Sequence, residues 1–558
     1  MEPLKIGVIY NQAREIMDHD ARLFFTLLND PKYEVVTVIK DGRSSENEKS
    51  FFQKIKISIL DGCFLRSLFY RIINLIESPL RKGDGGVSLN IEELKIRISA
   101  LPCIEMTPER KGYFDIFSKN DCTKIENLDL VILLQHEFGI IRGEFLRTPK
   151  YGIWSFHNTE NRAHRDTPAG FWEVYNNDSV TGITLQVLGD DQDGGKVIQK
   201  GFYNTPEFWY QNLAVILDSS VDLILKHLRL LYENRELKTE SNGVYSGMVY
   251  MPPSSFQLGK YIFKKYAKVA FRKSRRTIRS LIRADDSKDI YKLHIGKGCI
   301  DNAVLWRSKT IEPPNNEFWC DPFLFEYEKQ VHVFFENFEF SRQKGKISVG
   351  IIGENQINAV KDAIDVNYHM SYPFVFEHNN DIFMIPETYE KKRLEIWKCK
   401  GFPSKWSLEK TLFEGISLAD STIAKDKDGE FWLFTNISYT KVTYFSSHLY
   451  IFKIDSPMMN EIIPHKLNPV VTDCRSARGA GNIYTDHEGR LIRPSQASQN
   501  GVYGECLNLC HVKELTIDSY QEEILETITP KIKNGLYAVH HLSQASGVFV
   551  VDGRYTNR

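Results

Sequence analysis

Short apolar runs alternate with a helical pattern at the start of the chain. Residues 5–10 (KIGVIY) and 34–40 (EVVTVIK) are nearly continuous apolar runs, and a helical pattern at 21–29 lies between them. Continuous apolar runs are typical of strands buried on both faces. A strand, a helix and a second strand in succession predict a βαβ opening and a parallel sheet. Further strands are expected at 128–135 and 152–156, and a helix at about 206–238.

A basic segment interrupts this pattern. It follows the Pro252-Pro253 pair, which marks a domain boundary, and residues 260–283 hold ten Lys or Arg and no acid. One interpretation is a solvated linker helix. The other is an amphipathic helix lying on anionic lipid. The second is favoured by the apolar residues among the charges, namely Ile262, Phe263, Tyr266, Val269 and Phe271.

From about residue 290 the pattern changes to short β-runs that repeat. Each copy has a strand, a polar turn and a second strand, and the copies start 51, 48 and 60 residues apart. The copies are 321–336, 372–387, 420–435 and 480–495, with a shorter fifth copy at 540–553. Hairpins repeating at this period indicate propeller blades, so we expect a five-bladed β-propeller.

Composition narrows the class of protein. A chain of 558 residues is too long for one core, and a net charge of −1 gives no general attraction to nucleic acid. The nine cysteines are scattered without a CxxC pair, which is typical of reduced thiols. The chain opens on a strand rather than a signal peptide, and no run of about 18 apolar residues is present. We therefore expect a soluble cytoplasmic protein that binds neither nucleic acid nor a structural metal.

The segment 152–196 carries residues suited to acyl transfer. His157 ends a strand, Asp193 lies in a Gly-rich turn, and the run Thr181-Gly182-Ile183-Thr184 stands between them. An imidazole of near-neutral pKa can remove a proton from an attacking amine, and a carboxylate can orient that imidazole.

These residues resemble a known family. The region 1–205 is similar to the catalytic domain that methionyl-tRNA formyltransferase and the sugar N-formyltransferases share, through Ser155-Phe156-His157, Arg165-Asp166, Pro168, Thr181–Thr184 and Asp193-Gly194-Gly195. The resemblance implies an α/β Rossmann-like domain that takes a formyl group from 10-formyltetrahydrofolate, with His157, Asp193 and Ser155 catalytic. It also implies that the folate lies against residues of 136–143, namely His136, Phe138, Gly139, Ile140 and Ile141.

One departure weakens this interpretation. Ser155 stands where the family has an asparagine, and a serine hydroxyl reaches less far toward an oxyanion than a carboxamide does. Losing one such donor costs about 10²–10³ in rate.

The repeats carry a second set of candidate residues. Asp321 and Asp420 open their copies at equivalent positions, and Glu336 and Glu387 share another. Convergent carboxylates suit acid/base chemistry at a glycosidic bond, and Arg478 suits a phosphate or carboxylate on a sugar. The plainer interpretation is that the aspartates cap turns and the glutamates pair with arginines. Aromatic residues that suit stacking on sugars are Trp319, Phe338 and Tyr372.

This part of the chain also resembles known propellers. The residues Trp319–Pro322, Pro386–Thr388, Ala419–Ser421 and Ser476–Gly479 are similar to those of propeller glycosidases, of bacterial glycoside phosphorylases and of the N-terminal domain of plant glucosamine inositolphosphorylceramide transferases.

Together these patterns predict an enzyme of bacterial surface-polysaccharide synthesis. Residues 1–250 would formylate an amino sugar carried on a nucleotide or lipid, 251–290 would hold the protein at the inner face of the membrane, and 291–558 would bind or process the glycan. In one alternative the propeller is the active glycosyl transferase or hydrolase and the first domain is degenerate. In another the whole chain is a non-catalytic glycan-binding scaffold.

Overall fold

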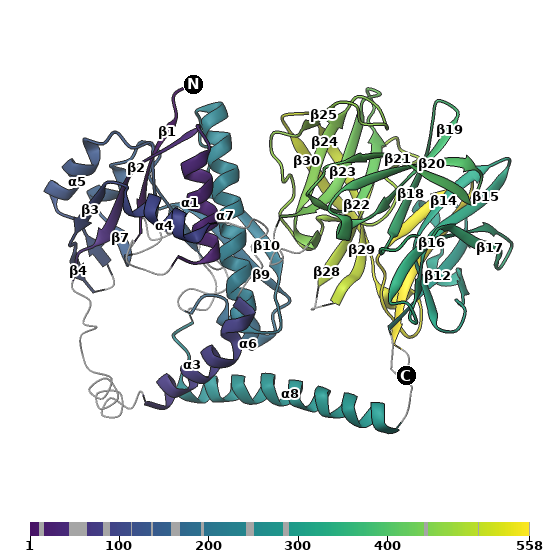
Figure 1. Cartoon of the computed structure of the whole chain (residues 1–558), viewed down its shortest axis with the longest axis horizontal. Helices are drawn as coiled ribbons and strands as arrows, with labels where there is room; N and C mark the ends of the chain where they lie inside the picture. Colours follow the sequence, from purple (N-terminus) through teal and green to yellow (C-terminus); the bar gives the residue numbers. More distant parts are fainter. Residues whose placement is uncertain are drawn as a thin grey trace. The chain divides into compact units, whose positions relative to one another are not determined.

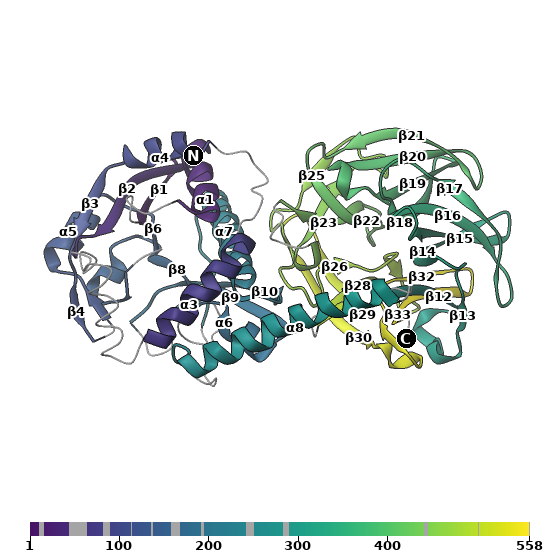
Figure 2. The ribbon, with the colours of Figure 1, turned by 60° about the horizontal axis from the view of Figure 1, so that its bottom comes forward.

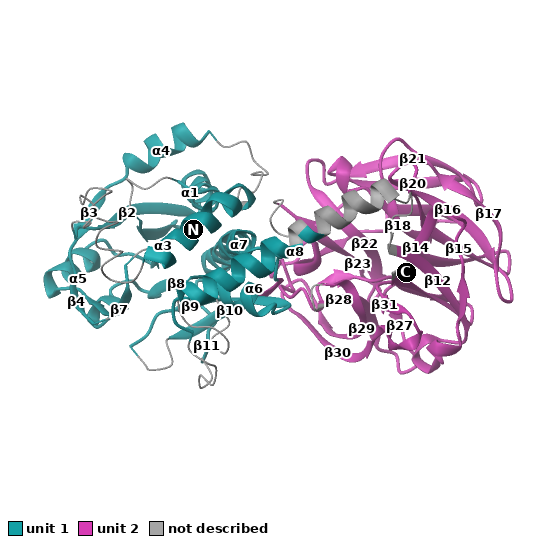
Figure 3. Ribbon diagram, turned by 90° about the horizontal axis from the view of Figure 1, so that it is seen from below, with its two compact units in different colours: residues 1–201, 205–276, 440–442 teal, residues 202–204, 277–439, 443–558 magenta. Residues whose placement is uncertain are grey.

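The computed structural model divides the chain into two compact units, which Figure 3 colours separately. The first comprises residues 1–201, 205–276 and 440–442, and the second 202–204, 277–439 and 443–558. The structure describes residues 1–10, 16–43, 64–81, 90–112, 114–135, 138–157, 168–190, 195–241, 250–282, 289–439, 445–499 and 502–556.

An eight-stranded sheet forms the centre of the first unit (Figure 1). Its order is β11 (Glu240–Ser241), β10 (Lys196–Asn204), β9 (Val180–Val187), β8 (Ile153–His157), β6 (Ile132–Gln135), β1 (Leu4–Ile9), β2 (Tyr33–Asp41) and β3 (Cys103–Met106). The pairs from β8 to β3 are parallel, whereas β9 runs antiparallel to β8. The predicted βαβ opening is confirmed, because β1 and β2 are parallel and a helix joins them.

Helices and a small second sheet complete the first unit. The helices are α1 (Asp18–Asn29), α3 (Phe64–Glu77), α4 (Ile91–Ser99), α5 (Lys119–Glu126), α6 (Phe171–Asn176), α7 (Trp209–Asn234) and α8 (Ser255–Ile282), with short 3-10 turns at Ser78–Arg81 and Glu144–Arg147. The small sheet has the order β4 (Glu109–Lys111), β5 (Phe114–Ile116), β7 (Ile140–Arg142). None of the helices within the described residues is long and apolar enough to cross a membrane.

The basic segment is anchored where it begins. Leu258 and Tyr261 of α8 are buried in an aromatic core with Phe171 and Trp209. The Tyr261 hydroxyl donates to Oε1 of Glu77 on α3 at 2.7 Å and accepts from the Trp209 backbone N–H at 2.9 Å. The first half of α8 is therefore packed into the first unit, which corrects the picture of a purely solvated linker.

The described part of the second unit is almost entirely β, as predicted, and contains five sheets. Three have four strands: β14 (Glu317–Tyr327) to β17, β18 (Ser371–His378) to β21, and β22 (Ser417–Lys425) to β25. The remaining strands of these sheets are β15 (Gln330–Glu339), β16 (Lys344–Ile352), β17 (Ile357–Ile364), β19 (Asp381–Glu387), β20 (Leu394–Gly401), β21 (Lys405–Leu412), β23 (Phe431–Ser438), β24 (Leu449–Ile454) and β25 (Ile462–Pro464).

The other two sheets have five strands each. The fourth contains β26 (Arg478–Gly479), β27 (Tyr484–Thr485), β28 (Leu491–Gln499), β29 (Val502–Leu515) and β30 (Tyr520–Ile528). The fifth joins the two ends of the unit, because β12 (Asp289–Lys297) and β13 (Lys309–Ile311) pair in one sheet with β31 (Leu536–Ala538), β32 (Leu542–Ala545) and β33 (Val548–Thr556). Short 3-10 turns lie at Ile300–Asn302, Leu305–Arg307, Tyr389–Lys391, Phe445–Ser447 and Pro530–Ile532.

The five sheets follow one another around a common centre (Figure 2). Strand β14 contacts β18, β18 contacts β22, and β22 contacts β26. The circuit closes where Gly481 bridges to Leu542 of β32, which in turn contacts β14. Each predicted repeat is an antiparallel hairpin in the structure, from β14–β15 to β32–β33.

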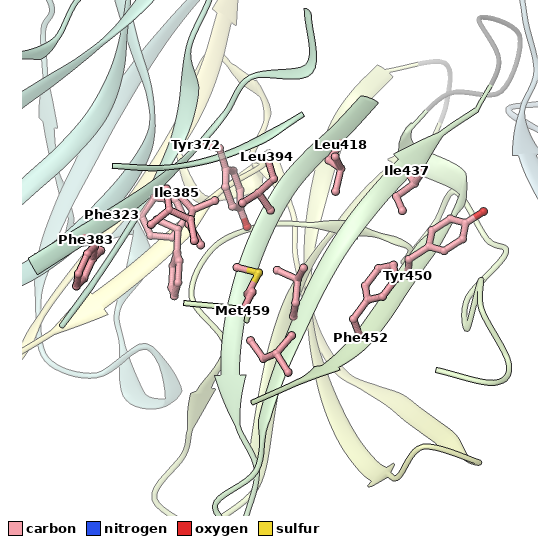
Figure 4. Close-up of a cluster of buried hydrophobic side chains, with 14 residues drawn as sticks. Phe323, Tyr372, Phe383, Ile385, Leu394, Leu418, Ile437, Tyr450, Phe452 and Met459 are labelled. Atoms are coloured by element: carbon pink, nitrogen blue, oxygen red, sulfur yellow. The ribbon is translucent and has the colours of Figure 1, made fainter. Parts of the chain in front are cut away.

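Buried apolar side chains fill the space between neighbouring sheets. Figure 4 shows one such cluster, which contains Phe323 of β14, Tyr372 of β18 and Leu418 of β22. These side chains are at most 3% exposed. The packing of sheet against sheet thus fixes how the inner strands face one another, and with them the polar residues at their ends.

Candidate active site

The first strands of three sheets share a local distortion. Asp321, Tyr372 and Asp420 have φ of 50°, 47° and 49°, and the ladder of each strand shifts register at that point. An L-residue in the left-handed region costs free energy, and such bulges re-aim side chains. The same left-handed backbone therefore occurs at equivalent positions of three sheets. Asp321 and Asp420 occupy two of these positions and so have matching backbone geometry.

Arg478 of β26 binds two of the predicted acids. Its Nε donates to Oδ2 of Asp420 at 2.5 Å, and its guanidinium lies 3.7 Å from Oε2 of Glu387. The backbone N–H of Asp420 donates to the same Glu387 oxygen at 3.3 Å. Arg478 is thus already paired with protein carboxylates, rather than presenting an open guanidinium to a sugar phosphate.

A histidine that the sequence analysis overlooked joins Asp321 to a further acid. His540 Nδ1 lies 2.7 Å from Oδ1 of Asp552, and its Nε2 lies 3.6 Å from Oδ1 of Asp321. The backbone N–H of Asp321 donates to Oδ2 of Asp552 at 3.0 Å. His540 was visible as the first residue of the fifth repeat, at the position equivalent to Asp321, but repeat position alone did not single it out.

Glu336 completes the group of acids. It accepts a hydrogen bond from the Cys320 thiol at 3.1 Å and lies 3.6 Å from His369 Nε2. We call Asp321, Glu336, Glu387, Asp420 and Asp552 the acid cluster; each is at most 9% exposed. Of the predicted propeller residues, all four acids and Arg478 belong to this connected site.

Burial sets the protonation of the cluster. It raises the pKa of Asp321 to about 7, while the His540 imidazolium pulls that value down and Asp552 pushes it up. Burial and the charge of Asp321 raise the pKa of Glu336 to about 8. Burial and the charge of Asp420 raise the pKa of Glu387 well above its usual range. At neutral pH the cluster therefore holds two protonated carboxyl groups, Glu336 and Glu387, together with Asp321, which exchanges its proton near pH 7.

The partner of His540 is ionised. Burial opposes ionisation of Asp552, yet the imidazolium and the backbone N–H groups lower its pKa. Burial likewise disfavours the charged form of His540, but Asp552 and Asp321 raise its pKa to about 9. The pair is a fixed imidazolium–carboxylate that orients Asp321.

Cys320, Asp321 and Asp552 offer three ligand atoms within 4.8 Å of one another. Burial raises the pKa of the Cys320 thiol well above its ordinary value, and this thiol donates to Glu336. A thiol must lose its proton to bind a metal, so the observed arrangement fits a hydrogen-bond network better.

A closed ring of aromatic and basic side chains contacts these acids. Neighbouring centroids, or the guanidinium and a centroid, lie 4.7 to 6.3 Å apart. We call this set the aromatic ring; in order it consists of Tyr291, Phe318, Phe338, His369, Tyr389, Phe445, Arg478, Tyr503 and His540. Its three basic members each contact the acid cluster. Tyr389 and Tyr503 are 38% and 37% exposed, so part of the ring is open to a ligand.

The three aromatic residues predicted to stack on sugars have different environments in the structure. Phe338 lies in the aromatic ring, stacked on Phe318 with centroids 4.7 Å apart and rings 6° from parallel. Trp319 and Tyr372 are 6% and 0% exposed and belong to the core, where the Tyr372 hydroxyl accepts from the Gly481 N–H at 2.8 Å. Stacking on a sugar is therefore excluded for Trp319 and Tyr372 as they stand.

The predicted formyl-transfer residues fall partly outside the described residues. His136 and Asp193 lie outside them, and His157 is described only as the backbone end of β8, paired with Thr184. Ser155 is half-buried on β8 between Gln135 and Gln186. No contact within the described residues joins it to a second predicted catalytic side chain.

Of the predicted folate-binding residues, the structure describes Phe138, Gly139, Ile140 and Ile141, which lie in β7 or directly before it. Phe138 has φ of 69° and packs edge-on against Phe117 with centroids 5.3 Å apart, and the Gly139 N–H donates to Asp115 at 2.5 Å. Ile140 and Ile141 belong to β7, where Ile141 is buried in the core.

A further histidine of the second unit, His541, makes the free energy of unfolding of that unit depend on pH. His541 is fully buried against Phe323 and Tyr372, and among the described residues neither ring nitrogen has a hydrogen-bond partner. Burial lowers its pKa to about 3. The unfolded chain binds this proton near pH 6.5 and the folded chain does not, so acid favours unfolding.

We therefore expect His541→Leu to weaken the acid sensitivity of unfolding. Between pH 7 and pH 5 this histidine alone costs the wild type about 2 kcal/mol of unfolding free energy, which the variant does not lose. Urea unfolding at the two pH values measures the difference. Equal losses in the two proteins would show that His541 is protonated in the folded state.

A family match falls within the second unit. Residues 299–544 match the family described as glucosamine inositolphosphorylceramide transferase 1, N-terminal. A protein with the name glucosamine inositolphosphorylceramide transferase 1 from Oryza sativa subsp. japonica is 33% identical over 256 residues, which cover 43% of this chain and 33% of the relative. Its namesake from Arabidopsis thaliana is 28% identical over 283 residues, covering 48% and 36%. The chain thus spans about a third of the length of the curated relatives it matches.

Solved structures give more distant likenesses. A thermostable family-43 glycoside hydrolase covers 43% of this chain and 89% of its own, with 14% identity and a TM-score of 0.31. Glycinamide ribonucleotide transformylase 1 from Symbiobacterium toebii covers 43% and 95%, with 13% identity and a TM-score of 0.29. At such TM-scores neither likeness bears on function.

The relatives correct the leading functional prediction. The proteins that match are named as glucosamine inositolphosphorylceramide transferases, from plants, so the prediction of folate-dependent formyl transfer in bacterial polysaccharide synthesis is wrong. The alternative, in which the repeats carry glycosyl transfer or hydrolysis, is the one that the relatives support.

Proposed function

We propose that the second unit is a five-bladed propeller that transfers a sugar at the acid cluster. The observation that carries this proposal is a buried group of five acids in contact with the aromatic ring, in which Glu336 and Glu387 are protonated at neutral pH and Asp321 titrates near pH 7. Aromatic faces bind the apolar faces of sugar rings, and paired carboxyl groups supply the acid and the base of reactions at a glycosidic bond.

Two residues take the proton-transfer roles. Asp321, with a pKa of about 7, removes the proton from the attacking hydroxyl while that oxygen bonds to the anomeric carbon. Glu387, protonated at neutral pH, gives its proton to the departing oxygen as the bond from the anomeric carbon breaks. The two groups exchange protons with solvent to complete the cycle.

Other members of the site position these two. His540, held by Asp552, fixes Asp321, and Arg478 fixes Asp420 beside Glu387. The near-complete burial of the acids limits the access of water.

The names of the relatives suggest the substrate class. They are called transferases of glucosamine and inositolphosphorylceramide. We propose a hexosamine as the transferred sugar, and the headgroup of a phosphate-containing lipid as the acceptor. The charged acid cluster suits the hydroxyls and the amine of such a sugar.

A second candidate is sugar binding without catalysis. The matched region is the N-terminal part of the relatives and about a third of their length, so their activity need not lie in it. In that case the aromatic ring recognises a glycan and the acids only orient it.

One assay separates the two candidates. The purified full chain is incubated with radiolabelled nucleotide-activated and alkyl-linked hexosamines and with vesicles containing phosphatidylinositol, and label in the lipid is counted. Transfer that persists in Asp518→Asn, an exposed acid of the same unit, and is lost in Asp321→Asn supports the proposal. Sugar binding without transfer from any donor supports the second candidate instead.

The pH profile gives a further prediction. Because Asp321 acts as a base with a pKa of about 7, kcat/KM for transfer falls about tenfold per unit below pH 7. His540→Gln removes the cation that favours the ionised carboxylate, so the acidic limb moves to higher pH. If the acidic limb of the kcat/KM profile stays at the same pH in His540→Gln, ionisation of Asp321 does not control the rate.

A further inference from the structure

The outward face of α8 carries large apolar residues that remain exposed in the part of the first unit that the structure describes. Phe256, Phe263 and Phe271 are 79%, 75% and 66% exposed. They recur at intervals of seven and eight residues, which places them along one line of an α-helix. Three exposed phenylalanines in a row are unusual for a surface in contact with water alone.

Lysines run beside this line. Lys260, Lys264 and Lys268 are exposed and follow one another every fourth residue, so they flank the phenylalanines on one side of the helix. Residues 251–283 contain no acid that would neutralise them. We call these six residues the Phe–Lys stripe.

The helix that carries the stripe is anchored near its start. The opposite face of α8 is buried through Leu258 and Tyr261, and Gly259 lies beside the ring of Phe69 of α3. The neighbouring α3 also exposes apolar side chains, among them Leu65 at 54% and Leu75 at 79%. Two adjacent helices thus leave apolar surface in water.

A cationic cavity lies at the edge of the stripe. It has a volume of about 240 Å³ and is lined by Tyr175, Asn177, Tyr261, Lys264, Lys265 and Lys268. Burial lowers the pKa of the Lys265 ammonium, and Lys268 and Lys264 add to the effect, whereas the carboxylates of Glu207 and Glu77, which do not line the cavity, oppose it. The lining holds three ammonium groups and no carboxylate, which suits a phosphate group.

We propose that the first unit docks on a bilayer of anionic phospholipid through the Phe–Lys stripe, with a headgroup phosphate in the cationic cavity. Phenylalanines enter the boundary between headgroups and acyl chains, while lysines alongside meet the phosphates. An anionic bilayer interacts favourably with both the phenylalanines and the lysines of the stripe. A nucleic acid would leave the phenylalanines in water, and a second copy of this helix would bring like charges together.

Vesicle flotation tests this proposal independently of sugar transfer. The full chain is expected to float with phosphatidylcholine vesicles that contain phosphatidylglycerol, and not with phosphatidylcholine alone. The triple substitution Lys260→Gln, Lys264→Gln, Lys268→Gln weakens binding by roughly fivefold per lysine, or about 100-fold in all. Added salt weakens wild-type binding in the same direction.

The phenylalanine arm and the controls complete the experiment. Phe256→Ser with Phe263→Ser and Phe271→Ser removes flotation without changing Tm, because the three side chains are exposed. The matched control Lys111→Gln, Lys119→Gln, Lys150→Gln removes three exposed lysines elsewhere in the unit and leaves binding unchanged. Equal binding to neutral vesicles, or no binding to anionic ones at low salt, would overturn the proposal. So would phenylalanine-dependent dimerisation without flotation.

Discussion

Asp321→Asn lowers the rate of sugar transfer by about 10²–10⁴-fold, because an amide cannot accept the proton of the attacking hydroxyl. The substitution keeps the size and shape of the side chain, and its oxygen can still face His540. The loss is therefore expected in kcat rather than in sugar binding. Steady-state transfer kinetics measure it, with Asp518→Asn as the matched control.

If Glu387 is the general acid, the rate loss in Glu387→Gln depends on the leaving group of the sugar donor. Glu387→Gln removes the proton that the departing oxygen receives, so its cost depends on that oxygen. An alkyl glycoside needs the proton and is slowed strongly, whereas a phosphate leaves readily without it. Equal losses with both donors would assign Glu387 to positioning, and unchanged rates with Asp321→Asn would remove the proposed base.

Arg478→Met lowers the free energy of unfolding by about 3–5 kcal/mol, because it leaves the buried carboxylate of Asp420 without its cation. Arg478 bonds Asp420 at 2.5 Å and lies 3.7 Å from Glu387, and both acids are at most 9% exposed. A loss of this size corresponds to a fall of roughly 6–20 °C in the Tm of the second unit. Differential scanning calorimetry of the full chain measures it.

A double substitution separates the lost ion pair from simple loss of packing. Asp420→Asn combined with Arg478→Met removes the unpaired charge, so the double variant is expected to be more stable than Arg478→Met alone. If the losses of unfolding free energy in Asp420→Asn and Arg478→Met simply add in the double variant, the ion pair between the two residues contributes no interaction energy of its own. A Tm within about 1 °C of the wild type for Arg478→Met would show that Asp420 is not buried and charged.

The repeats in the sequence allowed the strands and the candidate acids of the second unit to be predicted. The positions of Asp321 and Asp420, and of Glu336 and Glu387, were identified because gapless alignment of the copies exposes equivalent residues. Alternating polar and apolar positions then indicate strands, and neighbouring hairpins bring their ends together. The equivalent repeat positions therefore predict that these acids lie near one another, without any knowledge of individual contacts.

What the sequence did not reveal depends on contacts between distant segments. His540 and Asp552 pair with Asp321 from more than 200 positions away, and no local pattern marks such a pairing. Tyr372 shares the repeat position and the left-handed backbone of the two aspartates, yet it faces the core. Burial distinguishes Phe338 from Trp319, and sequence alone carries no measure of it.

In the first unit the pattern predicted the fold better than the chemistry. Apolar runs located β1, β2, β6 and β8, because a buried parallel strand has a distinctive composition. The spacing between Thr181 and Asp193 suggested a site, but Thr181 is a buried residue whose hydroxyl bonds Thr205 at 2.9 Å. A spacing that fits a catalytic motif is also compatible with ordinary packing.

The central claim is that a sugar binds within the aromatic ring, and photo-crosslinking tests it most directly. A glucosamine derivative bearing a diazirine is irradiated with the full chain, and the modified residues are located by mass spectrometry. We predict labels on ring members such as Tyr389, Tyr503 and Phe338, reduced by excess free sugar and lost in Tyr503→Ala. Labels confined to the first unit, or labels that free sugar does not reduce, would contradict the claim.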